Sequence, residues 1–187
     1  MAERKRTGRV PAAKSRRIYE LEVGLLSGFF TEAFAKANPV VARTILICGG
    51  QTLEQLHAAI FEAYDRFDEH MYEFQVGGKR PQDRTARRYV LSGVGSDLFD
   101  DSEAAGTVTD TTLDDLGLKE GEAFVYWFDF GDDWWHQINV VAIREEAGSG
   151  KYPRITARVG ESPPQYPDLD DEGDDDDDDE EDDDEET

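Results

Sequence analysis

The sequence predicts an α+β domain with a mostly antiparallel sheet, one main helix packed on a face and a C-terminal aromatic β-hairpin. Three observations lead to this fold class. Residues 18–23 alternate apolar and polar side chains, residues 53–65 carry an apolar stripe at helical spacing, and two aromatic strands flank Gly-Asp-Asp at 131–133. Strands and helices alternate too irregularly for a doubly wound parallel sheet, so an antiparallel layer backed by a helix is expected.

The charge of the chain divides it into three parts. The chain has 187 residues and a formal net charge of -23, but residues 168–187 hold 17 acidic residues and no basic one. Residues 1–17 hold seven basic residues and one acidic residue. Both ends have almost nothing apolar to bury, so we predict a disordered basic arm and a disordered acidic tail. Residues 18–167 have the usual size of one domain.

The composition argues against several classes of protein. No run of about 18 apolar residues is present, and the basic start is not followed by an apolar segment before Ile18. We therefore expect neither a membrane span nor a secretory leader. The one cysteine, Cys48, cannot form an internal disulfide, which favours a reducing, cytoplasmic location. The acidic body repels phosphates, so no direct sequence-specific reading of nucleic acid is expected.

The first elements follow from local patterns. Residues 18–26 alternate apolar and acidic side chains, which indicates a half-buried strand. Residues 29–37 predict a short helix that ends before Asn38 and Pro39, because the residue before proline disfavours helix. Residues 40–48 are apolar and largely β-branched, and they predict a second strand.

The main helix has the clearest signals of the middle segment. Thr52 and Gln55 form a capping box, and the apolar stripe then predicts a helix over about 53–65. A strand is expected at 71–76, and a very short one at 89–91.

The last third of the domain is expected to be largely β-structure. Residues 92–110 are rich in Asp, Gly and Ser and predict a loop, and residues 111–117 predict a capped helical turn. Residues 123–130 and 134–143 predict the two strands of the hairpin, and residues 152–159 an extended stretch.

The aromatic hairpin is a candidate binding surface. Consecutive residues of a strand point to opposite faces, so either Trp134 or Trp135 leaves the core face. That tryptophan is then covered by a second layer or, with Tyr126, marks a surface for a protein or ligand.

The hairpin turn is also a candidate catalytic site. Asp129, Asp132, Asp133 and His136 place three carboxylates and an imidazole within eight residues, which can hold a divalent cation or supply a general base. The alternative is structural, because Asp and Gly are the residues that tight turns favour.

The three histidines allow a further hypothesis. His57, His70 and His136 lie on different predicted elements, and neutral imidazoles bind zinc if they converge. The alternative is a buried polar network in which His70 and Glu73 contact the Asp129–His136 hairpin. No cofactor is required by the sequence, although a divalent metal fits the first hypothesis.

A resemblance to a known family rests on an ordered set of segments. These are Tyr19–Val23, Pro39–Val41, Thr52–His57, His70–Phe74 and Phe128–His136, the last reading Phe-Asp-Phe-Gly-Asp-Asp-Trp-x-His. Over about residues 18–167 the chain resembles the plasmid pRiA4b ORF-3-like family, also called MM3350-like. Members are often described as passenger proteins of an IS1096-type insertion element.

The resemblance implies a compact α+β fold and little about activity. Many relatives have a second histidine where Tyr72 stands, and cysteines around the position of Pro163 and Pro164. A metal site that depended on those residues would be absent from this chain.

Three functions follow as hypotheses. The first is a non-enzymatic, cytoplasmic interaction module that binds a protein, with a basic partner for the acidic tail. The second is a metal-dependent hydrolase centred on the Asp129–His136 cluster. The third, which the resemblance alone implies, is an accessory protein of a mobile element such as a transposon or plasmid.

Overall fold

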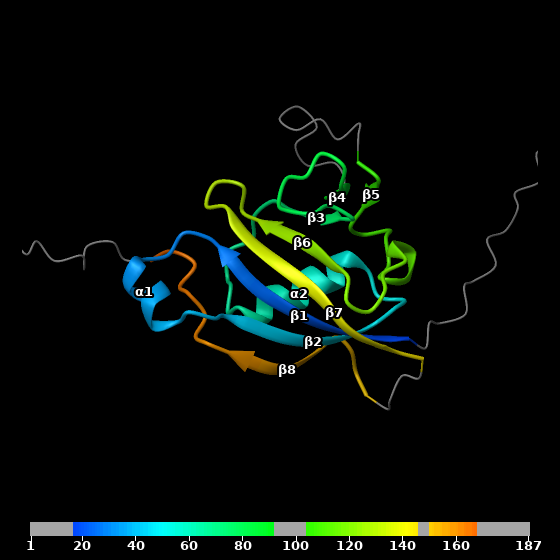
Figure 1. Cartoon of the computed structure of the whole chain (residues 1–187), viewed down its shortest axis with the longest axis horizontal. Coiled ribbons are helices and arrows are strands. Elements are labelled where there is room, and N and C mark those ends of the chain that lie inside the picture. The colour runs from blue at the N-terminus through cyan, green and yellow to red at the C-terminus, as the bar shows by residue number, and fades with distance from the viewer. Residues whose placement is uncertain (1–16, 92–103, 146–149, 168–187) are drawn as a thin grey trace, which may run out of the picture.

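The structure, a computed structural model, describes residues 17–91, 104–145 and 150–167. Eight strands form one sheet in the order β5-β4-β3-β6-β7-β1-β2-β8 (Figure 1). Six of the seven neighbouring pairs are antiparallel and only β4 and β5 run parallel. Helix α2 lies against one face of this sheet, behind the strands in the view of Figure 1. The predicted α+β class with a mostly antiparallel sheet therefore agrees with the structure.

The strands and helices have the following bounds in chain order: β1 Ile18–Ser27, α1 Glu32–Ala37, β2 Ala42–Cys48, α2 Leu53–Ala63, β3 Tyr72–Val76, β4 Arg87–Val90, β5 Gly106–Thr107, β6 Ala123–Phe128, β7 Trp134–Arg144 and β8 Arg154–Val159. A single 3-10 turn over Asp114–Leu116 precedes β6. No helix in the described part of the chain is long and apolar enough to cross a membrane.

The core forms between α2 and the covered face of the sheet. On β1, Tyr19, Leu21 and Val23 are fully buried, and the alternation of a strand turns Glu20 and Glu22 to the other face. Helix α2 presents its buried residues to this face: Leu53, Leu56, His57, Ala59, Ile60 and Ala63. The alternation predicted for the first strand therefore assigns the buried and the exposed face of β1 correctly.

Several boundaries differ from the predicted ones. Helix α1 begins three residues later than expected because Thr31 caps it, its hydroxyl accepting the Phe34 amide at 3.1 Å. Strand β5 was not expected, because Gly106–Thr107 has no strand pattern of its own and pairs with β4 through tertiary contact. Strands β6 and β7 pair antiparallel, and β8 follows them, so this pair is not the C-terminal element of the sheet. The proposed arm and tail, and loop residues 92–103, lie outside the described residues.

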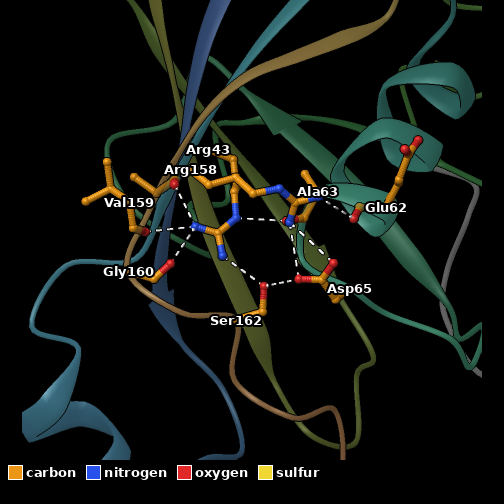
Figure 2. A network of polar contacts seen from close by, with 9 residues as sticks. Arg43, Glu62, Ala63, Asp65, Arg158, Val159, Gly160 and Ser162 are labelled. Atoms are coloured by element: carbon orange, nitrogen blue, oxygen red, sulfur yellow. Dashed lines mark hydrogen bonds and ion pairs between the residues drawn. The ribbon is translucent and has the colours of Figure 1, made fainter.

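A buried arginine joins the end of α2 to the edge of the sheet (Figure 2). Arg43 on β2 donates from Nε to the carbonyl of Ala63 and from Nη1 to that of Val159, both at 2.8 Å. Its Nη2 donates to the Ser162 hydroxyl at 2.8 Å, which in turn donates to Asp65 at 2.7 Å. The C-terminus of α2 is thereby held against β2 and the segment that follows β8.

We call residues 160–167 the C-terminal strap, because they run back along the connection between α2 and β3. The side chain of Gln165 accepts the amides of Phe67 and Asp68, both at 3.1 Å, and donates to the carbonyl of Asp68 at 2.7 Å. The hydroxyl of Tyr166 donates to the Asp68 carboxylate at 2.6 Å. The strap therefore fixes the segment that carries Glu69 and His70.

Candidate functional site

A groove with a volume of about 590 Å³ opens beside α2, at the start of β3. Its lining comes from α2, from the α2–β3 connection and from the ends of β3 and β4: Glu54, His57, Ala58, Glu69, His70, Met71, Tyr72 and Leu91. Two of the three histidines singled out in the sequence therefore share one groove.

His57 lies at the inner wall of the groove and has a partner at each ring nitrogen. Its Nδ1 is 2.7 Å from the hydroxyl of Tyr126, and its Nε2 is 3.2 Å from Oε2 of Glu69. The ring stacks on Tyr72 with centroids 3.7 Å apart and planes 4° apart. His57 lies with Leu56 on the buried side of α2 and is only 5% exposed.

These contacts fix the protonation of His57. A carboxylate can only accept a hydrogen bond, so Nε2–H donates to Glu69. Burial lowers the pKa of His57, although Glu69 opposes this, and the imidazole is neutral at pH 7. Nδ1 then accepts the O–H of Tyr126, whose phenol stays protonated because burial raises its pKa well above the usual value. A hydrogen-bonded chain therefore runs from buried Tyr126 through His57 to exposed Glu69.

The groove is acidic. Glu54 and Glu69 are both exposed at its rim, and no Lys or Arg occurs among the described residues that line it. The apolar side chains of Ala58, Met71 and Leu91 also line the groove. The arrangement suits a ligand that combines an apolar stem with a positive charge.

His70 lies at the mouth of the groove and contacts the strap. Its Nε2 is 2.9 Å from the hydroxyl of Tyr166, 3.5 Å from the carboxylate of Asp68 and 3.6 Å from that of Asp129. The predicted contact between His70 and the 129–136 segment is therefore present, but it is made through Asp129.

The turn between β6 and β7 uses its aspartates mainly for its own geometry. Asp129 and Asp133 have φ values of 53° and 54°. The carboxylate of Asp129 accepts the amides of Gly131 and Asp132 at 3.1 and 3.4 Å, and that of Asp133 accepts the Trp127 indole at 3.0 Å. Burial and the neighbouring Asp129 raise the pKa of Asp132. Turn chemistry thus explains Asp129 and Asp133 without a catalytic role.

His136, unlike the residues of this turn, lies deep in the core. It is 1% exposed, and its ring packs edge-on against Tyr64 at 4.8 Å and lies 5.3 Å from that of Tyr126. Burial, with a smaller contribution from the Arg66 charge, lowers the pKa of His136 to about 3. Across residues 17–91, 104–145 and 150–167, no group of three or more His, Cys, Asp or Glu side chains is placed to hold a metal ion.

The aromatic residues predicted to bind a partner are buried. Tyr126 and Trp134 lie on the helix-facing side of the sheet, where Trp134 is 0% exposed. Trp135 points to the opposite face, as predicted, but it stacks on Trp127 at 4.4 Å and is only 7% exposed. Trp135 is therefore covered by its cross-strand neighbour in the same sheet, which is neither the second layer nor the exposed binding surface that the sequence predicted.

Glu73 does not join the contacts of His70. It is buried on the face opposite His136, where its carboxylate receives the guanidinium of Arg88 at 2.6 Å and the amide of Gln75 at 2.6 Å. The predicted network of His70 and Glu73 is therefore wrong in the case of Glu73, because alternation along β3 turns that side chain to the other face.

Sequence reasoning missed Glu69, Tyr72, Gln165 and Tyr166 as parts of the site. Glu69 and Tyr72 each lie two residues or fewer from His70, so proximity was a usable signal for them. The strap residues have no such signal, because Gln165 reaches the α2–β3 connection only after β8 has paired with β2.

Comparison with known proteins finds similar chains of unknown function. A family profile described as "Plasmid pRiA4b ORF-3-like protein" matches residues 32–171. "Uncharacterized protein y4hQ" of Sinorhizobium fredii (strain NBRC 101917 / NGR234) is 25% identical over 130 residues, 68% of this chain and 59% of that protein. The match thus spans about three-fifths of the relative's length.

A solved structure shares the fold. The crystal structure of the protein of unknown function MM3350 from Methanosarcina mazei Go1 superposes with a TM-score of 0.56 at 22% identity. The match covers 77% of this chain and 70% of that one. Strand β1 precedes the family match, although it lies between β7 and β2 in the sheet.

Proposed function

The chain belongs to the plasmid pRiA4b ORF-3-like family, and we propose that it is a non-enzymatic binding module whose groove beside His57 takes a basic side chain of a partner protein. The single observation that carries this proposal is the charge of the groove. Its two carboxyl side chains are those of Glu54 and Glu69, no Lys or Arg lines it, and Ala58, Met71 and Leu91 add apolar surface.

The chemistry of lysine and arginine fits these surroundings. Both have an apolar stem that packs on Met71 and Leu91 while the charged head reaches a carboxylate. A hydrogen bond between charged groups is stronger than a neutral one, and arginine can bind a carboxylate with two parallel bonds. Glu69 is already oriented by His57, which reduces the ordering that binding requires.

The surroundings of the Asp129–His136 segment favour binding over hydrolysis as the role of this protein. A general base must reach its substrate within hydrogen-bonding distance. His136 is sealed in the core, and the carboxylates of Asp129 and Asp133 are engaged by turn amides and an indole. A cytoplasmic location forms part of the proposal, since the one cysteine suits a reducing compartment.

A peptide titration tests the groove. The probe is a fluorescent peptide with one Lys and one Arg in an otherwise neutral sequence, and binding to the full chain is followed by anisotropy. Replacing both Glu54→Gln and Glu69→Gln should weaken binding by about tenfold, because each lost charge removes roughly 0.5–1 kcal/mol. Glutamine can still accept from His57, so the hydrogen-bonded chain to Tyr126 is kept.

Glu62→Gln is the matched control, since Glu62 is an exposed acid on the same helix outside the groove. It should leave the dissociation constant within about twofold, and the acidic tail contributes equally to all variants. If Glu62→Gln weakens binding as much as the double replacement does, attraction is nonspecific and the proposal fails.

A further inference from the structure

Three buried side chains on the helix-facing side of the sheet have polar atoms without a hydrogen-bond partner in the described part of the chain. They are Arg66 (Nε, Nη1 and Nη2), Trp134 (Nε1) and His136 (Nδ1 and Nε2). For His136 the backbone of Trp134 and of Tyr126 is nevertheless close enough to favour its protonated form, so Arg66 and Trp134 are the clearer cases. Arg66 is 8% exposed, and the other two are almost fully buried. Buried polar groups in proteins nearly always have a partner, and leaving a charged one unpaired is costly.

The three side chains lie together. The guanidinium carbon of Arg66 is 3.5 Å from the centroid of the Trp134 ring. Trp134 and His136 are two residues apart on β7, so they project from the same face. The charge of Arg66 is close enough to lower the pKa of His136, after the larger effect of burial.

The hydrogen-bonding capacity of this group is almost entirely that of donors. The guanidinium has five N–H groups and the indole has one. The neutral imidazole of His136 adds one N–H and one acceptor nitrogen. Such a set suits a partner that is rich in acceptors, and the positive charge of Arg66 favours an anion over a neutral acceptor.

Neighbouring oxygen atoms are mostly committed elsewhere. The hydroxyl of Tyr64 donates to the carbonyl of Val23, and that of Tyr126 lies 2.7 Å from His57. One carboxylate oxygen of Asp129 accepts two turn amides, while the other faces His70. Among the described residues, the carboxylates of Asp129 and Asp132 both stabilise the charge of Arg66. Since the turn amides engage Asp129, the half-buried carboxylate of Asp132 is the intramolecular rival to test.

We propose that Arg66, Trp134 and His136 form a buried site for a small oxyanion, a carboxylate or a phosphate. A planar guanidinium matches two oxygens of either group, the Trp134 N–H can complete the shell, and the His136 ring lines the site. Arg66 follows α2 on the connection held by the strap, so access to the site requires that this connection move. This site is separate from the acidic groove.

Nuclear magnetic resonance of the full chain tests the site. Inorganic phosphate or acetate is titrated at constant ionic strength while the three indole N–H signals are followed. The Trp134 signal should shift and saturate, whereas that of Trp127, which is bonded to Asp133, should stay in place. The melting temperature should rise by about 5–10 °C at 100 times the dissociation constant. The anion with the lower dissociation constant shows whether the site prefers a phosphate or a carboxylate.

Two variants isolate the guanidinium. Arg66→Met keeps the volume and should abolish both the shift and the rise in melting temperature, while Arg66→Lys keeps the charge and should retain a weaker response. Arg84→Met, at an exposed arginine, is the control for loss of one positive charge and should respond like the wild type.

Asp132→Asn decides between the anion and the intramolecular rival. If Asp132 is the partner of Arg66, Asp132→Asn should lower the stability of the otherwise wild-type chain but not that of the Arg66→Met chain. Neither anion should then shift the Trp134 signal. That result overturns the proposal. If the oxyanion is the partner, Asp132→Asn should strengthen binding, because one nearby negative charge is removed.

Discussion

The hydrogen bond between Tyr126 and His57 ties the core to the candidate groove. Tyr126 is buried at the centre of the sheet, so its hydroxyl cannot find water in place of Nδ1 of His57. Tyr126→Phe should lower the free energy of unfolding by about 1–3 kcal/mol, because it leaves a buried acceptor unpaired. Urea denaturation measures the change.

Tyr89→Phe provides a matched comparison for that loss. Tyr89 is buried on β4, and no hydrogen bond of its hydroxyl is present among the described residues. Tyr89→Phe should lower the free energy of unfolding by less than about 0.5 kcal/mol. Equal losses in the two variants would show that the Tyr126–His57 bond contributes nothing to stability.

His136 should make stability depend on pH. Burial lowers its pKa in the folded protein to about 3, while the unfolded chain binds a proton near the ordinary value of 6.5. The unfolded state therefore binds more protons below pH 6.5, and His136 destabilises the fold progressively from there toward pH 3. Its contribution approaches about 1.4 kcal/mol per pH unit. Urea midpoints between pH 7 and 5 should fall less steeply in His136→Leu than in the wild type.

At the scale of elements, Arg43 connects three parts of the fold. It serves carbonyls at the end of α2 and the end of β8 and the first residues of the strap. Arg43→Met should destabilise the protein by about 3 kcal/mol, since the carbonyls of Ala63 and Val159 and the Ser162 hydroxyl lose a shared donor together. Arg43→Lys should not restore stability, because an ammonium cannot reproduce the planar fork. Chemical denaturation tests both, and exposed Arg154→Met on β8 should have little effect.

The strap can be tested separately from the rest of the fold. Gln165→Ala removes the acceptor of the Phe67 and Asp68 amides, so hydrogen exchange at these two positions should accelerate by tenfold or more. Amides in β1 and β7 should be unaffected. The same change at exposed Gln137 should leave Phe67 and Asp68 protected; if it does not, the effect is global and the strap is not their anchor.

Elements with their own local signals were the ones that the sequence predicted well. Helix α2 begins where Thr52 and Gln55 form the capping box, and both bonds of that box are present. Strand β5 and the start of α1 were missed because pairing with β4 and the Thr31 cap decided them. Local patterns report propensity and periodicity, whereas these boundaries depend on tertiary contact.

The candidate site depends on the whole molecule, which is why the sequence predicted only part of it. His57 and His70 were singled out by residue type, but their partners Tyr126 and Tyr166 come from distant segments. Trp134 and Trp135 were placed on opposite faces correctly, yet their burial depended on Arg66 and Trp127. Convergence of this kind follows from topology, and no single segment encodes it.

Charge is distributed so that most of it should not affect folding. Residues 168–187 carry 17 of the acidic residues, and the sheet and α2 are complete without them. Deleting these residues should change the free energy of unfolding by less than about 0.5 kcal/mol. It should also weaken binding of a basic peptide at low salt more than at high salt, because exposed charges are screened. A loss of stability above 1 kcal/mol would assign the tail a structural role.

The central place of β1 has a consequence for the order of events during synthesis. Ile18 lies opposite Cys48 on one side and opposite Arg144 on the other. A ribosome that adds 5–20 residues per second needs roughly 5 to 20 seconds to pass from one partner to the next. Throughout that interval one edge of β1 has no native neighbour. The pairing of β1 is therefore completed only late in synthesis, and we expect one of its edges to stay unpaired for seconds.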